Sequence, residues 1–128
     1  MQLLLDTHAL LWWLAGDAKQ LSRRARAAIG NEDNTIYVSA ASAWEISTRQ
    51  RLGKLDAGIL SGRMSKVIAR QAFMILDITM DHAERAGGLP GTHKDPFDRM
   101  LIAQAQAENL ALVSNESVFD AYAVTRIW

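Results

Sequence analysis

Four carboxylates occupy positions that could build a metal site. Asp6 directly follows an apolar run at residues 3–5, and Asp98 falls in the first turn of a helical segment. Glu45 and Glu116 each follow a predicted strand by a few residues. Converging carboxylates repel one another unless a cation joins them, and their oxygens suit Mg²⁺ or Mn²⁺. Such a site can activate a water molecule and stabilise the charge that develops on a phosphodiester.

The segments that would position these acids alternate between strands and helices. Strands are predicted at residues 3–5, 35–39, 73–78, 110–113 and 124–128. Helices are predicted at residues 9–14, 22–29, 42–52, 61–72, 80–87 and 95–109, with a short helical turn at 116–122. This alternation is typical of an α/β fold with a parallel sheet covered on both faces. Because parallel strands point the same way, we expect Asp6, Glu45 and Glu116 beyond one carboxyl edge, where such sheets place their sites.

Each acid also has a purely structural interpretation. Asp6 is suited to cap the helix that follows it. Residues 42–45 (SAWE) have the spacing of a capping box, in which Ser42 bonds the first turn and Glu45 reaches back. Residues 95–98 (DPFD) combine an Asp cap, a proline at the first helical position and an acid three residues on. Caps have no reason to cluster, so the convergence of the acids favours a metal site.

Composition excludes several classes of protein. The chain has 128 residues and no cysteine, which rules out disulfides and thiolate metal sites. With three histidines, any metal site would depend mainly on carboxylates. The 14 basic and 14 acidic residues balance, unlike the charge of a strongly basic nucleic-acid binder. A nuclease remains compatible with this balance, because its bound ions carry the positive charge that the substrate meets.

The chain shows no membrane or export signal. Its N-terminus lacks the basic start and the cleavage site of a signal peptide. No apolar run approaches the roughly 20 residues that span a bilayer. We therefore expect a cytoplasmic protein without membrane contact, and residues 1–128 are predicted to form a single domain because no repeat or linker interrupts them.

Four segments together resemble the PIN-domain ribonucleases, especially the VapC-type toxins of bacterial toxin–antitoxin pairs. They are residues 5–12 (LDTHALLW), 38–46 (VSAASAWEI), 93–105 (HKDPFDRMLIAQA) and 112–116 (LVSNE). The third is the most specific, because many residues match in a row. The resemblance implies a three-layer α/β/α fold with a five-stranded parallel sheet. It also implies an endoribonuclease that depends on Mg²⁺ or Mn²⁺, a cognate antitoxin as protein partner, and a homodimer.

The resemblance also assigns roles to individual residues. Asp6, Glu45 and Asp98 match the family's acidic metal-site positions, whereas Glu116 stands where the family commonly has Asp. We expect Asp6 and Asp98 to bind the principal ion, Glu45 to bind it or orient the attacking water, and Glu116 to be a peripheral ligand. Because Glu is one methylene longer than Asp, that departure leaves the number of metal ions open.

Several other polar residues carry two interpretations each. The Thr7 hydroxyl is expected to hold Asp6 or to help cap the helix. Arg99 would contact the scissile phosphate or pair with a site acid, because its fork suits both; its alternative is a solvated helix face. His8 and His93 are interpreted as structural rather than as general acids.

Two further groups are assigned to surfaces. Of Trp12 and Trp13, adjacent on a helix, one is expected in the core and the other exposed towards an antitoxin or a second copy. A basic cluster is formed by Arg49, Arg51 and Lys54. It would either bind RNA phosphates or merely interact favourably with the dipole at the C-terminus of its helix.

Three hypotheses about function follow. The leading one is a toxin-type endoribonuclease acting on structured or single-stranded RNA. A DNA nuclease or an RNA-processing enzyme of the same family is the second. The third is a binding domain without catalysis, against which the presence of Asp6, Glu45 and Asp98 counts.

Overall fold

The five predicted strands form one parallel sheet. The computed structural model describes residues 1–17, 19–56, 58–60 and 62–128. Its strands are β1 (Gln2–Leu5), β2 (Thr35–Ser39), β3 (Met74–Leu76), β4 (Ala111–Val113) and β5 (Arg126–Ile127). They run parallel in the order β3-β2-β1-β4-β5, so the predicted α/β class and sheet are confirmed. The chain continues outward from β1 in both directions, which makes the end of β1 the topological switch point.

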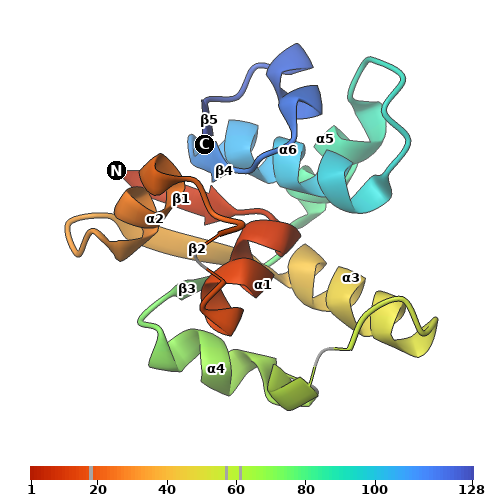
Figure 1. Ribbon diagram of the computed structural model, residues 1–128. Coiled ribbons are helices and arrows are strands. Elements are labelled where there is room, and N and C mark those ends of the chain that lie inside the picture. The colour runs from red at the N-terminus through yellow and green to blue at the C-terminus, as the bar shows by residue number, and fades with distance from the viewer. Residues whose placement is uncertain (18, 57, 61) are drawn as a thin grey trace.

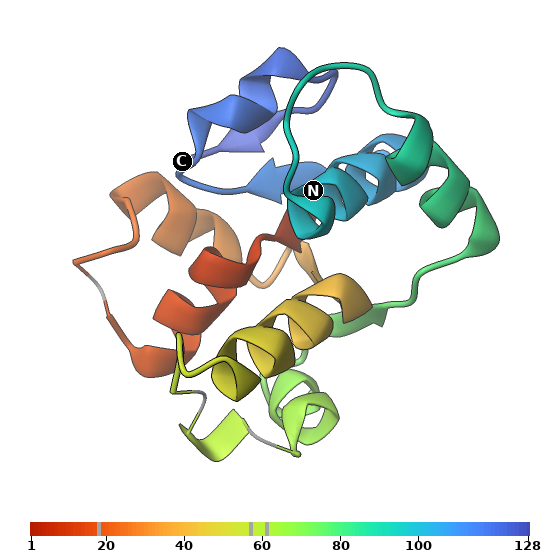
Figure 2. The same cartoon turned by 90° about the vertical axis from the view of Figure 1, so that its right-hand side faces the viewer.

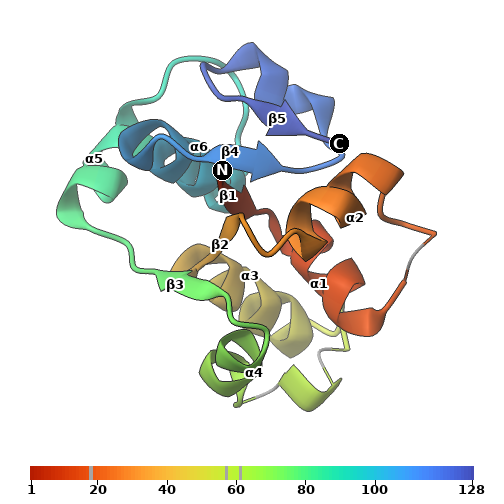
Figure 3. The ribbon, with the colours of Figure 1, turned by 90° about the vertical axis from the view of Figure 1, so that its left-hand side faces the viewer.

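Six α-helices and two short 3₁₀ turns complete the described part of the chain. They are α1 (Thr7–Ala15), α2 (Arg23–Gly30), α3 (Ala40–Arg51), η1 (Gly58–Leu60), α4 (Met64–Arg70), α5 (Met80–Gly88), α6 (Pro96–Glu108) and η2 (Ser117–Ala121). Figures 1 and 3 show α1 and α2 on one side of the strands and α5 and α6 on the other. The helix predicted at 61–72 is shorter in the structure, and its first residue lies outside the described residues.

The apolar side chains divide between the two faces of the sheet. In β1, Leu3 and Leu5 join the core beneath α1, α2 and α4, while Leu4 points into the core beneath α6. All three are fully buried, as expected for a central parallel strand with helices on both faces. The expected three-layer arrangement is therefore confirmed.

The helix α3 begins earlier than the sequence analysis predicts. Ser39, the last residue of β2, caps it by accepting a hydrogen bond from the Ala41 backbone N–H at 3.0 Å. The predicted capping box of Ser42 and Glu45 is therefore wrong, because both residues lie inside the helix. The strand passes directly into the helix without a loop. Ser39 and Ser42 have the same capping chemistry, so the local sequence pattern does not distinguish the true cap, Ser39, from Ser42.

Three helices meet at the carboxyl edge of the sheet. α1 follows β1 and contacts α3, and α3 in turn contacts α6. Figure 2 shows these three helices grouped at this side of the molecule. No helix in the described part of the chain combines the length and the apolar character needed to cross a bilayer.

Candidate active site

A pocket of about 200 Å³ opens at this carboxyl edge. The structure brings all four acids named from the sequence to it. Its lining consists of Asp6, Thr7, His8, Glu45, Arg49, His93, Asp95, Asp98 and Glu116. These residues come from three distant segments of the chain and from the turn after β4. We refer to it as the acidic pocket.

Asp6 lies at the switch point of the sheet and is buried. Its Oδ1 accepts a hydrogen bond from the Ala9 N–H at 2.8 Å, so the predicted cap on α1 is confirmed. Burial raises the pKa of Asp6 to about 6, and the charge of Glu116 adds to the rise. Hydrogen bonds from Ser114 and Ala9 and the charge of His8 oppose it. The cap occupies Oδ1, and Ser114 also donates to this carboxylate.

Glu45 is buried on the side of α3 that faces α1. The Thr7 hydroxyl donates a hydrogen bond to Glu45 Oε1 at 2.6 Å, and Arg49 Nη2 lies 2.6 Å from Oε2. Thr7 therefore holds Glu45 rather than Asp6, which corrects the expectation from the sequence. Ser42 Oγ lies 3.2 Å from the same hydroxyl. Both oxygens of Glu45 are thus fixed by groups on two different helices.

Asp98 lies in the first turn of α6. Asp95 caps this helix by accepting hydrogen bonds from the Phe97 and Asp98 N–H groups, and Pro96 occupies the first turn as predicted. Asp98 Oδ2 lies 2.9 Å from His93 Nε2. Burial raises the pKa of Asp98 to about 6 against the hydrogen bond from His93, and the charges of Asp95 and Glu116 add to the rise.

Glu116 occupies the rim of the acidic pocket. Its side chain is 38% exposed, and Oε1 lies 3.7 Å from His8 Nδ1. Its charge nevertheless contributes to the raised pKa of both Asp6 and Asp98. Glu116 is therefore close enough to act on the two buried acids while remaining open to solvent.

The guanidinium group of Arg99 donates to backbone carbonyl oxygens and not to a carboxylate. Nε and Nη1 donate to the carbonyl oxygens of Ala86 and His93 at 3.2 and 3.1 Å, and Nη2 donates to that of Leu89. Within the described residues the guanidinium makes no ion pair, so the predicted contact with a site acid is wrong. Arg99 instead ties the end of α5 to the loop that carries His93, where a cation also suits the helix dipole.

The donor set fits a hard divalent cation. Carboxylate oxygens from Asp6, Glu45 and Asp98 face one small pocket, and two of these acids have raised pKa values because their charges are poorly solvated there. A cation would relieve that cost. In the described part of the chain no three His, Asp or Glu side chains stand ready as a complete ligand group. Arg49, which pairs with Glu45, and His93, which contacts Asp98, would have to yield to an ion.

Four lining residues have no place in the site that the sequence predicts: His8 and Asp95, which are interpreted as structural, and Arg49 and His93. Arg49 was grouped with the basic end of α3, although its spacing of four residues from Glu45 is a recognised pairing distance on a helix. His93 was interpreted as structural, and no periodicity marks its contact with Asp98, because it lies in a loop. The geometry of that loop depends on Arg99, which only the folded chain reveals.

The two adjacent tryptophans on α1 are both partly buried, which corrects the expectation that one is exposed. Trp12 stacks on His8 with ring centroids 5.4 Å apart and touches Trp128. Trp13 packs against Phe73 and donates a hydrogen bond from Nε1 to Gln71.

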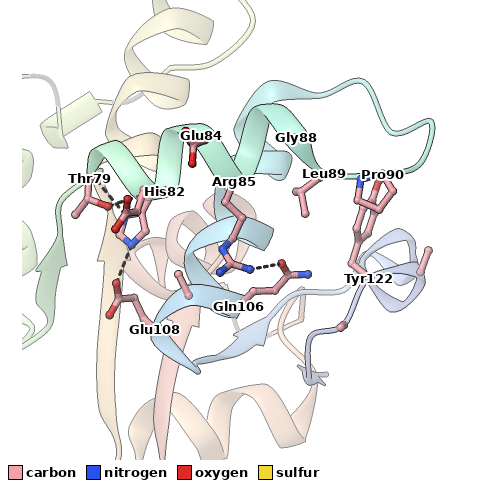
Figure 4. A pocket seen from close by; sticks show the side chains of 14 residues that line it. Thr79, His82, Glu84, Arg85, Gly88, Leu89, Pro90, Gln106, Glu108 and Tyr122 are labelled. Atoms are coloured by element: carbon pink, nitrogen blue, oxygen red, sulfur yellow. Dashed lines mark hydrogen bonds and ion pairs between the residues drawn. The ribbon is translucent and has the colours of Figure 1, made fainter.

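A more voluminous cavity of about 950 Å³ lies elsewhere, between α5, the end of α6 and η2 (Figure 4). His82, Arg85, Glu108 and Tyr122 are among its lining residues. Its polar groups are largely paired with one another: His82 Nε2 with Glu108 at 2.8 Å, and Arg85 Nη1 with Gln106 at 3.4 Å. None of the acids of the acidic pocket lines it. Volume alone therefore does not identify the site with the richest chemistry.

Comparison with known proteins gives one family and a consistent fold. The PIN-domain family model matches residues 3–124. VapBC2 from Rickettsia felis bound to a promoter DNA fragment superposes with a TM-score of 0.67 at 17% identity, over 98% of this chain and 97% of that one. A toxin–antitoxin complex from Klebsiella pneumoniae superposes with a TM-score of 0.63 at 22% sequence identity, over 98% of this chain and 96% of that one. FitAcB from Neisseria gonorrhoeae superposes with a TM-score of 0.63 at 20% sequence identity, over 98% of this chain and 96% of that one. No curated protein matches the sequence.

Proposed function

Because this chain belongs to the PIN-domain family, we propose that it is a metal-dependent endoribonuclease that uses Mg²⁺ or Mn²⁺. The observation that carries the proposal is the acidic pocket itself. Three acids from distant segments converge there at the switch point of the sheet, and burial raises the pKa of two of them. Nuclease activity is general to the family.

Each acid has a role in the proposed reaction. Asp6 and Asp98 would hold the principal ion, Glu45 would hold it or orient the attacking water, and Glu116 would be a peripheral ligand at the rim. The bound ion would supply the positive charge that a phosphodiester needs and the acidity that makes water a nucleophile. Thr7 keeps Glu45 in place through its 2.6 Å hydrogen bond. Arg49, partly exposed at the mouth of the pocket, is placed to meet a phosphate.

We propose further that the protein is the toxin of a toxin–antitoxin pair. Its structural neighbours were solved as such complexes. An apolar groove of about 600 Å³, with Leu11, Trp12, Leu14 and Val67 among its lining residues, lies between α1 and α4. An amphipathic segment of a cognate antitoxin would fit such a groove. As a toxin acting on cellular RNA, the protein would work in the cytoplasm, and we expect it to form a homodimer.

The test is an RNA digest with the purified chain, free of any co-expressed partner. Cellular RNA is incubated with Mg²⁺ or Mn²⁺, with EDTA and with an Asp6→Asn variant, because Asn keeps the helix cap but loses the charge. A Glu108→Gln variant is the matched control, since Glu108 also pairs with a histidine but lies outside the acidic pocket. Cleavage that requires metal, disappears with Asp6→Asn and survives Glu108→Gln supports the proposal.

The same experiment separates the alternatives. Metal-dependent cleavage of DNA in preference to RNA would favour a DNA nuclease. A folded protein that binds Mn²⁺ but cleaves no RNA or DNA would favour the binding domain without catalysis. Cleavage unaffected by EDTA would contradict the metal-dependent reaction altogether.

A further inference from the structure

Trp44 is an exposed tryptophan next in sequence to an acid of the acidic pocket. It precedes Glu45 on α3, and 60% of its surface is open to solvent. The other tryptophans, all within the described residues, are partly buried against neighbours on or near α1. Tryptophan is enriched at binding surfaces, because its large ring has an apolar face and a polar edge. Trp44 is therefore a candidate contact for a ligand.

Phe97 fixes the orientation of this tryptophan. The two rings pack edge to face, with centroids 4.9 Å apart and planes at 77°. Phe97 precedes Asp98 on α6 just as Trp44 precedes Glu45 on α3. The contact between α3 and α6 that brings the two acids to one pocket thus also joins the two aromatic rings. Each ring belongs to the residue that directly precedes an acid of the pocket, with Trp44 exposed and Phe97 partly buried.

The surroundings of Trp44 favour a small flat ligand over a protein surface. One turn further along α3 stand Ser47 and Thr48, and Arg51 follows on the same side. A protein interface needs a contiguous apolar core, whereas the neighbours on the C-terminal side of Trp44 are polar or charged. A nucleobase offers a flat π-face of the size of an indole, joined to an anionic backbone. Arg51, which is exposed, supplies positive charge for that backbone.

We propose that Trp44, braced by Phe97, is a stacking platform for an unpaired RNA base next to the nucleotide whose phosphate enters the acidic pocket. The proposal rests on the proposed ribonuclease function and specifies its substrate as single-stranded at this position. Stacking is tolerant of sequence, because every base has a π-face. The platform would therefore select for an unpaired strand rather than for a particular base.

The test measures RNA binding in the Asp6→Asn background, where no cleavage is expected. A short fluorescein-labelled single-stranded RNA is titrated and its anisotropy followed. Trp44→Ala should weaken binding about tenfold, and Trp44→Phe less, because a phenyl ring still stacks. The matched control is Met80→Ala, which removes an exposed apolar side chain (86% open) from the start of α5. Binding of the same RNA in a duplex should not respond to Trp44→Ala.

A second readout is specific to stacking. Bound RNA should quench the intrinsic fluorescence of the protein, and the quenching should largely disappear in Trp44→Phe. Equal affinity of the Trp44→Ala and Met80→Ala variants for single-stranded RNA would overturn the proposal. Dissociation of a dimer by Trp44→Ala, with unchanged RNA affinity per protomer, would also overturn it and assign this surface to a second copy.

Cleavage assays on the chain with Asp6 intact keep the two proposals separable. Normal RNA cleavage that is insensitive to Trp44→Ala would reject the platform and leave the ribonuclease. Loss of RNA binding in Trp44→Ala, in a protein that cleaves no RNA under any metal condition, would retain the platform and reject the ribonuclease.

Discussion

The two ends of α6 each carry a histidine–carboxylate pair, and the pairs serve different purposes. At the N-terminal end, His93 Nε2 lies 2.9 Å from Asp98; at the C-terminal end, His82 Nε2 lies 2.8 Å from Glu108 (Figure 4). The two distances are nearly the same. What differs is the set of groups that faces each pair.

The pair of His82 and Glu108 is structural. His82 is 1% exposed, and its Nδ1 accepts a hydrogen bond from the Thr79 N–H, so Nε2 carries the proton and donates it to Glu108. The Thr79 hydroxyl accepts in return from the His82 N–H, which closes a capping box on α5. Glu108 is 46% exposed, so water solvates its charge. Nothing in this arrangement requires a further ligand.

The pair of His93 and Asp98 lies among other acids. Burial raises the pKa of Asp98, and the charges of Asp95 and Glu116 add to the rise. Burial and the charge of Glu116 likewise raise the pKa of Asp6. One histidine cannot neutralise several carboxylates. The comparison shows that a histidine–carboxylate distance does not by itself identify a functional site, whereas an excess of buried carboxylates indicates a place for a cation.

The largest expected difference between the two ends is in activity. Asp98→Asn should lower metal-dependent RNA cleavage at least about 100-fold, because it removes a proposed ligand and not merely its support. Glu108→Gln should leave the rate within about twofold, as a surface change outside the site. Initial rates at saturating Mg²⁺ measure both. A similar loss in the two variants would contradict the distinction drawn here.

Stability should respond in the opposite order. His82→Ala removes a buried side chain and the cap on α5, and should lower the free energy of unfolding by about 2–4 kcal/mol. His93→Ala, at a more open position, should cost about 1 kcal/mol or less. Urea denaturation without added metal compares the two. Equal destabilisation would mean that the site loop contributes as much to the fold as α5 does.

The buried carboxylates of the acidic pocket should also make the stability of the fold depend on pH. Folding raises the pKa of Asp6 and Asp98 from 3.8 to about 6, so the folded protein binds more protons between those values. The free energy of unfolding should therefore fall as pH rises through this window and remain lower at neutral pH. The effect is at most about 3 kcal/mol for Asp6, and smaller for the more open Asp98.

Denaturation at about pH 5 and about pH 7.5 measures this slope. Asp6→Asn should flatten it, and Mg²⁺ at the higher pH should restore stability to the parent chain by binding the folded state. Stability that rises with pH in the same range would show that the two acids are better solvated than their burial indicates.

The smallest effect on RNA cleavage is expected for Glu116, at the rim of the acidic pocket. Glu116→Gln removes a charge that acts on Asp6 and Asp98 but lies partly in solvent, so cleavage should fall only a few-fold. Glu116→Asp, which introduces the acid common in the family, tests whether the longer side chain limits the reaction. A loss as large as that of Asp98→Asn would make Glu116 a principal ligand.

Much of the fold could be predicted because its signals are local. The apolar run before Asp6, the β-branched segment at 35–39 and the proline after Asp95 each determine their element through nearby residues. The start of α3 could not be located in this way. Ser39 and Ser42 have the same capping chemistry, and the pairing of Ser39 with Leu76 in the sheet places the end of the strand directly against the helix.

The sequence by itself determined that Asp6, Glu45 and Glu116 lie at the carboxyl edge, because each follows a strand and parallel strands point the same way, whereas Asp98 was added by the family resemblance. Only the tertiary structure decided the partners of those acids. Thr7 and Arg49 hold Glu45, His93 meets Asp98, and Arg99 holds the His93 loop. The physical reason is the distance along the chain over which each kind of interaction acts. Strand and helix patterns arise from neighbours along the chain, whereas burial, pKa and side-chain pairing depend on segments that meet only when the sheet and its helices pack.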